Sequence, residues 1–239
     1  MSEPIFMVRL HLDAKKVQRQ GRERHLTAEA LDMGYLVHCA LREVLGDAAP
    51  QPFVVSSLRR TSLEVLGYGS CPINDLRRRI NPSASQAYGL DMETLATKRM
   101  PNRIPAGTTL EFRVRVCPVV RKAANGPVYQ SGAEIDVFLA EVEKSGKDAV
   151  IKREEIYRRW LTQQLEKGGA ACVNARLTAF RQIWIVRRDN HRRACALRRP
   201  DAMVEGVLHV LDSDRFQRLL RHGIGRHRAF GFGMLLLRR

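Results

Sequence analysis

The C-terminal stretch from residue 223 to residue 239 places the tightest constraint on what this chain can fold into. It begins GIGRHRAFGFG, with Gly223, Gly225, Gly231 and Gly233, and continues as the apolar run MLLL. Glycine weakens the interior of helices and strands, so these residues predict a loop that leads into a last strand. Glycine also lets backbone N–H groups approach an anion, and the sequence RHR lies between the two glycine pairs. The stretch indicates either a phosphate-binding loop or a plain turn.

The charge of the chain narrows the class of partner. The 239 residues include 41 basic and 25 acidic side chains, which gives a net charge of +16. Only 8 of the basic residues are lysine, so 33 are arginine. The forked guanidinium suits bidentate contacts to phosphates and base edges. We therefore expect nucleic acid as the partner, with an anionic membrane surface as the competing interpretation.

Targeting signals and cysteine usage indicate a cytoplasmic protein. The chain has no run of the roughly 18–20 apolar residues that a membrane span requires, and its N-terminus lacks a secretory pattern. Its cysteines are odd in number and scattered without a C-x-x-C pair: Cys39, Cys71, Cys117, Cys172 and Cys195. This pattern argues against a disulfide framework and a structural zinc site. We expect no metal, no cofactor and no membrane partner.

Hydrophobic periodicity gives the first half of the chain the order β-α-β-β-α-β. The predicted elements are a strand at 4–12, a basic loop at 15–25, a helix at 28–45 with Thr27 as its N-cap, strands at 53–58 and 63–66, a helix near 87–96, and a strand at 109–116. In that last strand Arg113 and Arg115 face away from the apolar Val114 and Val116. The order is that of a ferredoxin-like unit.

The second half repeats this outline. After a Pro- and Gly-containing connection at 117–132, the predicted elements are a strand or helix at 134–140, a helix at 152–166, a strand at 177–186, a return arm at 194–197, a strand at 204–211, a helix at 215–221 and a last strand at 233–237. The sequence thus predicts an α+β protein of tandem ferredoxin-like (RRM-like) domains, residues 1–118 and 119–239, with a C-terminal glycine-rich loop.

Three motifs give the chain a resemblance to a known family. The run from Val204 through the glycine loop to Leu236 resembles the C-terminal signature of CRISPR-associated repeat-processing endoribonucleases, and most closely their CasE (type I-E) branch. The segment FRVRVCP at 112–118 is similar to the F-R-x-R-x-N-P strand of that branch, with Cys117 in place of Asn. Tyr35, His38 and Leu41 match its Y-x-x-H-x-x-L pattern.

The resemblance implies a fold and an activity. The family fold is a pair of ferredoxin-like domains, and its members cut CRISPR precursor RNA once in each repeat without a metal. The 2′-OH attacks the adjacent phosphorus and leaves 2′,3′-cyclic phosphate and 5′-OH ends. The resemblance also implies stem-loop repeat RNA as substrate, retention of the mature guide RNA, and association with other subunits of a CRISPR effector complex. Two alternatives stay open: a catalytically silent RNA-binding subunit, and a type IV processing enzyme that relies on Arg rather than His.

The same resemblance nominates the catalytic residues. His38 would serve as general acid or base, since imidazole titrates near neutrality, and Tyr35 lies one helical turn earlier on the same face. His25, in the basic loop before that helix, is a competing candidate. Arg22, Arg24 and Arg42 are candidates for stabilising charge. His227, within the glycine loop, is expected to contact a phosphate rather than to transfer a proton.

Arginine clusters predict the rest of the RNA interface. The predicted hairpin is dense in arginine, with Arg187, Arg188, Arg192, Arg193, Arg198 and Arg199. Such an arm suits contacts to RNA phosphates or to a stem's groove. Further predicted contacts come from Arg121 and Lys122, from Arg113 and Arg115, and from the loop residues Gly223, Gly225, Arg226, His227, Arg228, Gly231 and Gly233. Aromatic residues make up 6% of the chain, so base stacking is expected to be secondary.

Overall fold

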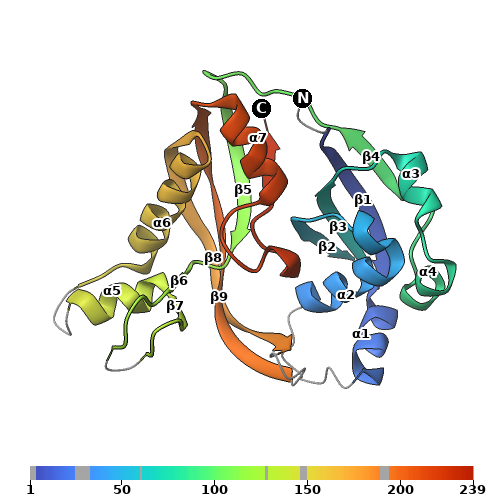
Figure 1. Ribbon diagram of the computed structural model, residues 1–239, viewed down its shortest axis with the longest axis horizontal. Coiled ribbons are helices and arrows are strands. Elements are labelled where there is room, and N and C mark those ends of the chain that lie inside the picture. The colour runs from blue at the N-terminus through green and yellow to red at the C-terminus, as the bar shows by residue number, and fades with distance from the viewer. Residues whose placement is uncertain are drawn as a thin grey trace.

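Two four-stranded antiparallel sheets stand side by side, with the glycine-rich loop between them (Figure 1). The computed structural model describes residues 4–24, 33–59, 61–126, 129–145, 150–188 and 194–238. Within these ranges no helix is long and apolar enough to cross a membrane.

The first sheet has the strand order β2-β3-β1-β4. Its strands are β1 (Phe6–Asp13), β2 (Phe53–Arg59), β3 (Ser62–Gly69) and β4 (Ala96–Arg99). Its helices are α1 (Ala14–Glu23), α2 (Met33–Leu45), α3 (Ile73–Arg78) and α4 (Pro82–Tyr88), and a short 3₁₀ turn η1 (Gly46–Ala48) follows α2. Alternate residues of β1, such as Val8 and Leu10, pack with Val37 and Leu41 of α2 in one buried cluster.

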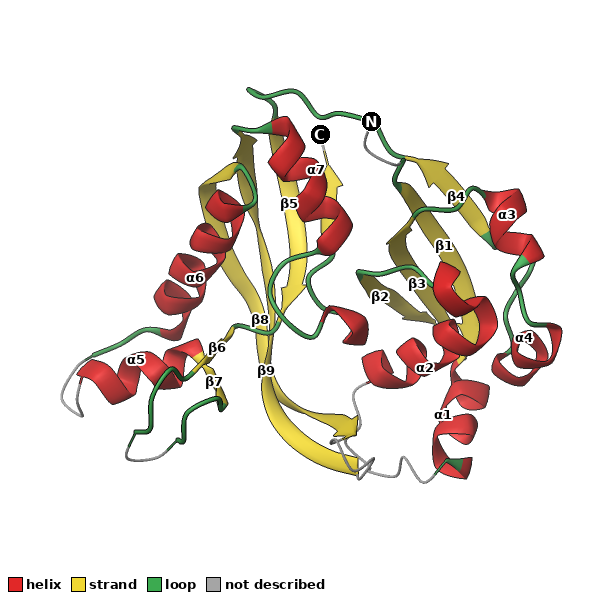
Figure 2. Ribbon diagram, in the orientation of Figure 1, coloured by secondary structure: helices red, strands yellow, loops and turns green. Residues whose placement is uncertain are grey.

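The second sheet has the strand order β10-β5-β9-β8. Its strands are β5 (Thr109–Val116), β8 (Ala170–Arg188), β9 (Ala194–Val210) and β10 (Leu235–Arg238). The helices α6 (Arg153–Lys167) and α7 (Ser213–His222) cover one face, and an insertion holds β6 (Val119–Arg121), β7 (Glu134–Asp136) and α5 (Val137–Ser145). Strands β8 and β9 extend beyond the sheet as a long curved arm (Figure 2).

Both sheets have the ferredoxin-like arrangement, so the predicted α+β fold of two such units is confirmed. In each unit the strands that come first, second, third and fourth lie in the order 4-1-3-2 across the sheet. The first unit uses β1, β2, β3 and β4, and the second uses β5, β8, β9 and β10. A helix follows the first strand and another follows the third, as this fold requires.

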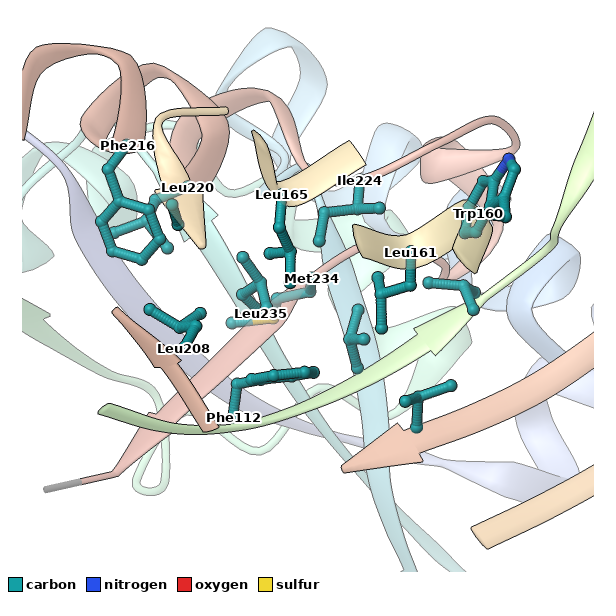
Figure 3. Close-up of a cluster of buried hydrophobic side chains, with 14 of the residues drawn as sticks. Phe112, Trp160, Leu161, Leu165, Leu208, Phe216, Leu220, Ile224, Met234 and Leu235 are labelled. Carbon is teal, nitrogen blue, oxygen red and sulfur yellow. The ribbon is translucent and has the colours of Figure 1, made fainter. Parts of the chain in front are cut away.

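One buried cluster joins the two units. The cluster contains Phe112, Leu208 and Leu235 of the second sheet, together with apolar side chains of α6, α7 and the loop (Figure 3). The first sheet contributes Ile5, Val54 and Tyr68 to the same cluster. The hydroxyl of Tyr68 donates a buried hydrogen bond of 2.8 Å to the carbonyl of Leu235. The open face of the first sheet is thus covered by the second unit.

Three sequence predictions are corrected. Residues 15–25 were expected to form a loop, but α1 begins at residue 14, with Asp13 as its N-cap. The helix expected near 87–96 is wrong, because the left-handed Gly89 ends α4 and a polar strand, β4, follows. The expected separate strands at 194–197 and 204–211 belong to one long strand, β9. The predicted N-cap Thr27 lies outside the described residues.

The strand at 109–116 is also corrected in its placement. It was expected to complete the first unit, but it pairs with β9 and β10 and is the first strand of the second unit. The fourth strand of the first sheet is β4, whose four residues, ATKR, carry little apolar alternation. The division between the two sheets therefore lies before residue 109, and the expected division of the chain at residue 118 does not coincide with it.

Candidate active site

Three rings from two distant parts of the chain surround the ring of Phe230. This phenylalanine ends the 3₁₀ turn η2 (Arg228–Phe230) in the glycine loop. Tyr35 and His38, both from α2, meet it edge-on with ring centroids 5.4 Å and 5.7 Å away. His227 stacks on it at 6.0 Å. The structure thus brings together Tyr35, His38 and His227, which the sequence nominated, around a phenylalanine that it did not.

The glycine loop has a backbone that only glycine adopts readily. Gly223, Gly225, Gly231 and Gly233 all have positive φ angles, between 73° and 81°. At the base of the loop the amide of Ile224 donates to the carbonyl of Gly233 at 2.8 Å. A Cβ at Gly233 would lie 2.3 Å from the carbonyl oxygen of Ile224. The glycines therefore close a compact loop whose two ends are hydrogen-bonded to each other.

The loop rests directly on α2. A Cβ at Gly231 would lie 3.8 Å from the Cα of Gly34 and 3.4 Å from the ring of Phe53. Arg115 lies beneath the loop, with its guanidinium 4.3 Å from the ring of Phe232 and its carbonyl accepting from the amide of Gly233 at 2.7 Å. These contacts fix the position of η2 relative to the helix that carries Tyr35 and His38.

Glu134 anchors the other side of the loop. This carboxylate at the start of β7 is only 8% exposed, and its Oε2 lies 3.0 Å from Nε2 of His227. Its Oε1 accepts from Arg226, and Nη2 of Arg199 approaches it at 3.5 Å. His227 has a φ of 59°, a left-handed conformation that is uncommon for a residue with a side chain. The sequence analysis missed Glu134. The only pattern that could have indicated it is the presence of an acidic residue in a short apolar segment of a basic chain.

Burial and local charge set the protonation of these groups. Burial, with the nearby charge of Arg42, lowers the pKa of His38 below its ordinary 6.5. Burial also lowers the pKa of His227, although Glu134 opposes this shift. For Glu134 burial raises the pKa, but His227, Arg226 and Arg199 outweigh it and hold the carboxyl pKa below its ordinary value. At neutral pH both imidazoles are therefore largely uncharged and able to accept a proton.

Some of the predicted RNA contacts lie near this site. Arg42 follows His38 by one turn of α2 and pairs with the exposed Asp47, at 2.9 Å. Arg199 and Arg226 gather at Glu134, and Arg228 donates to the carbonyl of His222 at 2.7 Å. Arg115 is mostly buried and holds Asp201, with its Nε 2.8 Å from Oδ1.

Others lie elsewhere or are held by acids. Arg113 is on the open face of the second sheet, 3.3 Å from Glu205. Arg24 pairs with Glu43, and Lys122 pairs with Glu143 at 2.6 Å. Exposed positions are occupied by Arg22 near the end of α1, Arg121 in β6 and Arg198 in β9. Arg187 and Arg188 belong to the last residues of β8, whereas His25, Arg192 and Arg193 lie outside the described residues.

Comparison with known proteins identifies the family. A family model described as "CRISPR associated protein" matches residues 5–239. The chain belongs to this family. No curated protein sequence matched the chain significantly.

Solved structures of CRISPR proteins share the fold over nearly the whole chain. The CRISPR endoribonuclease Cse3 bound to a 19-nucleotide RNA has a TM-score of 0.67 at 19% identity, with 100% of each chain covered. Thermus thermophilus Cse3, bound to an RNA that represents a pre-cleavage complex, gives 0.64 at 18% identity, covering 99% of this chain and 100% of that one. The CRISPR-associated protein Cas6e of Escherichia coli K-12 gives 0.60 at 16%, covering 97% and 98%.

Proposed function

We propose that this CRISPR associated protein is an endoribonuclease that cuts CRISPR precursor RNA within each repeat. The observation that carries the proposal is the meeting of His38 and Tyr35 with the glycine loop at Phe230. This contact places a histidine that can transfer a proton, and a tyrosine, beside a loop that is suited to bind phosphate, in a strongly basic chain. Proteins of the same fold include Cse3 bound to RNA before cleavage, which supports the assignment of RNA as substrate.

In the proposed reaction His38 transfers a proton and Tyr35 positions the 2′-OH. The 2′-OH attacks the adjacent phosphorus as its proton passes to a base, the bond from phosphorus to the 5′-oxygen breaks, and that oxygen takes up a proton from water. The lowered pKa of His38 leaves its imidazole free to take the first proton at neutral pH. Tyr35 orients the 2′-OH through its hydroxyl, because a phenol with an ordinary pKa of about 10 is a poor base unaided.

The glycine loop stabilises the charge that develops on the phosphorane. Among the described residues, the amides of Gly225, Arg226 and His227 have no hydrogen-bond partner, so they are available to an anion. The side chain of Arg226, which pairs with Glu134, is 44% exposed beside them. Fixed donors aimed at developing negative charge commonly contribute a large part of catalysis. His227 contributes its amide to this site, while its side chain is held in place by Glu134.

The arm of β8 and β9 would retain the product. It carries Arg198 at an exposed position, and Arg187 and Arg188 are the last two residues of β8. An arm of this length along an RNA stem supplies phosphate contacts that depend on charge rather than on sequence. A protein of the same fold is part of a CRISPR RNA-guided surveillance complex. We therefore include retention of the guide RNA and association with other effector subunits in the proposal.

Replacing His38 tests the assignment. With the cognate repeat RNA in EDTA, we expect cleavage by the wild-type protein and a rate reduced by about 10²–10⁴-fold for His38→Ala, with RNA affinity unchanged. His209→Ala is the matched control, because His209 lies on β9 and hydrogen-bonds Thr109 in the second sheet. A 2′-deoxy substitution just 5′ of the cut must abolish the reaction.

Three results would redirect the proposal. Binding without cleavage by the wild-type protein would make it a silent RNA-binding subunit. Full activity of His38→Ala together with loss of activity in Arg42→Ala would favour an Arg-dependent processing enzyme. Cleavage of the 2′-deoxy RNA would disprove internal attack.

A further inference from the structure

A basic pocket adjoins residues 223–225 of the glycine loop. It is a shallow hollow of about 260 Å³ between the C-terminal end of α6, the exposed side of α7, and the start of the loop. Its rim carries Lys167, Arg215, Arg218 and His222, and its wall includes the backbone of Gly223 and Gly225. None of these basic residues was nominated from the sequence.

The charge around this pocket is of one sign. Its lining contains no aspartate or glutamate. Lys167 and Arg218 are exposed, and neither side chain forms a hydrogen bond or ion pair with any residue that the structure describes. The nearby carboxylate of Asp212 caps α7 by accepting from the amides of Asp214 and Arg215, and its charge also acts on Arg215 and Arg218. Neither Lys167 nor Arg218 is held in a direct ion pair within the described part of the chain, so both are available to an external anion.

The remaining side chains give the pocket a fixed shape. Nη2 of Arg215 donates to the carbonyl of Lys167 at 2.9 Å, which ties α7 to the end of α6. The helices approach so closely that a Cβ at Gly168 would lie 2.4 Å from Cδ2 of Leu219. Leu219 provides apolar surface between the cations, whereas the side chain of Ile224 is buried in the core. A cationic rim beside an apolar side chain fits a sugar-phosphate unit better than a small inorganic anion.

We propose that this pocket binds a phosphate of the single-stranded RNA flank next to the repeat stem. Residues 223–225 line the pocket, and residues 226–230 continue to the candidate active site, so the same loop serves both. Lys167 and Arg218 line the pocket beside the part of the loop that precedes the candidate active site in the chain. The inference rests on the proposed function, because it takes the repeat RNA as the ligand.

RNA binding by a double variant tests the pocket. For Lys167→Ala with Arg218→Ala, we expect roughly tenfold weaker binding of a stem-loop that has single-stranded flanks on both sides, and a salt slope smaller by about 1.4. A stem-loop trimmed of its flanks should bind the variant and the wild type equally. Arg215 is left intact because it holds α6. Arg77→Ala with Arg79→Ala, beside α3 at the opposite edge of the molecule, removes the same charge as a control (Figure 1).

The comparison between the two RNAs decides the outcome. Equal weakening on flanked and trimmed RNA, or the same weakening in the control variant, would show a general charge effect and overturn the proposal. An unchanged affinity for flanked RNA would overturn it as well, once circular dichroism shows that the variant is folded. If the wild-type protein binds flanked RNA without cutting it, the cleavage proposal fails while the flank-dependent difference still tests the pocket.

Discussion

At the scale of single residues, one carboxylate organises the charges of the loop. Glu134 faces three groups that carry or can carry positive charge, His227, Arg226 and Arg199, in a chain with a net charge of +16. Without it these groups would repel one another at close range. The carboxylate also fixes the imidazole, because Nε2–H of His227 donates to it and Nδ1 is left as the acceptor.

Glu134→Gln should lower the pKa of His227 further. Burial already holds this pKa below 6.5, and the negative charge of Glu134 is the influence that raises it. The pKa is read from an NMR titration of the imidazole signals. Glu205→Gln, which removes an exposed partner of Arg113, should leave it unchanged. A higher pKa for His227 in Glu134→Gln would contradict this electrostatic account.

Glu134→Gln should also change how the free energy of unfolding depends on pH. The folded-state pKa of Glu134 is below its unfolded value, so its ionised form stabilises the fold above about pH 4.3, and this contribution is lost as the pH falls through the folded pKa. The difference in unfolding free energy between wild type and Glu134→Gln should therefore shrink below pH 4. Denaturant unfolding at several pH values measures it. A difference that keeps growing while the pH falls through the folded pKa of Glu134 would be the contrary result.

At the scale of elements, the site depends on how closely the glycine loop approaches its neighbours. Gly231 rests on Gly34 of α2, and Gly225 would place a Cβ 2.9 Å from the indole of Trp160. The loop cannot rise away from these surfaces without moving Phe230, on which Tyr35 and His38 pack. The backbone conformation of this loop and the geometry of the candidate site are therefore coupled.

Gly233→Ala should destabilise the protein more than Gly107→Ala. The two glycines have similar φ angles, 80° and 88°, so both substitutions incur the left-handed penalty of about 1–2 kcal/mol. A Cβ at Gly107 meets nothing within 4 Å, whereas at Gly233 it collides with Ile224 backbone. We expect an additional loss of about 1–3 kcal/mol for Gly233→Ala in thermal or denaturant unfolding, with reduced cleavage. Equal losses of unfolding free energy in the two variants would mean that the loop accommodates the added Cβ at Gly233 without a further cost.

At the scale of the whole molecule, the two ferredoxin-like units share one buried cluster. Their shared cluster includes Tyr68 from the first sheet and Phe216, Leu220 and Leu235 from the second unit. Burial of apolar surface across such a contact ties the stability of each unit to that of the other. The loop and α2, which belong to different units, therefore keep their relative position in the native protein.

Unfolding should accordingly be a single transition, and Tyr68→Phe should shift it without splitting it. Loss of the hydroxyl leaves the buried carbonyl of Leu235 without this 2.8 Å bond, at a cost of about 1–3 kcal/mol. Both tryptophans, Trp160 and Trp184, lie in the second unit, so fluorescence reports that unit while far-UV circular dichroism reports both. Two separated transitions in the wild type would refute the shared core.

The sequence by itself determined the features that depend on local patterns. Alternation and helical spacing predicted most strands and helices, because side-chain periodicity follows backbone geometry. The four glycines predicted a loop, and all four have positive φ. The spacing of Tyr35 and His38 placed them on one helix face, since residues three apart are neighbours there.

Tertiary structure decided what depends on pairing across long sequence separations. Strand 109–116 has the same alternation whichever sheet it joins, and only packing assigned it to the second. The residue pairs Glu134–His227 and His38–Phe230 are far apart in the chain, so no local pattern marks them. The sequence of β4 has too little apolar alternation to predict a strand, and only its pairing with β1 shows that it is one. The sequence thus indicated which residue types form the candidate site. Their assembly around Phe230 and Glu134 depends on the packing of the two units.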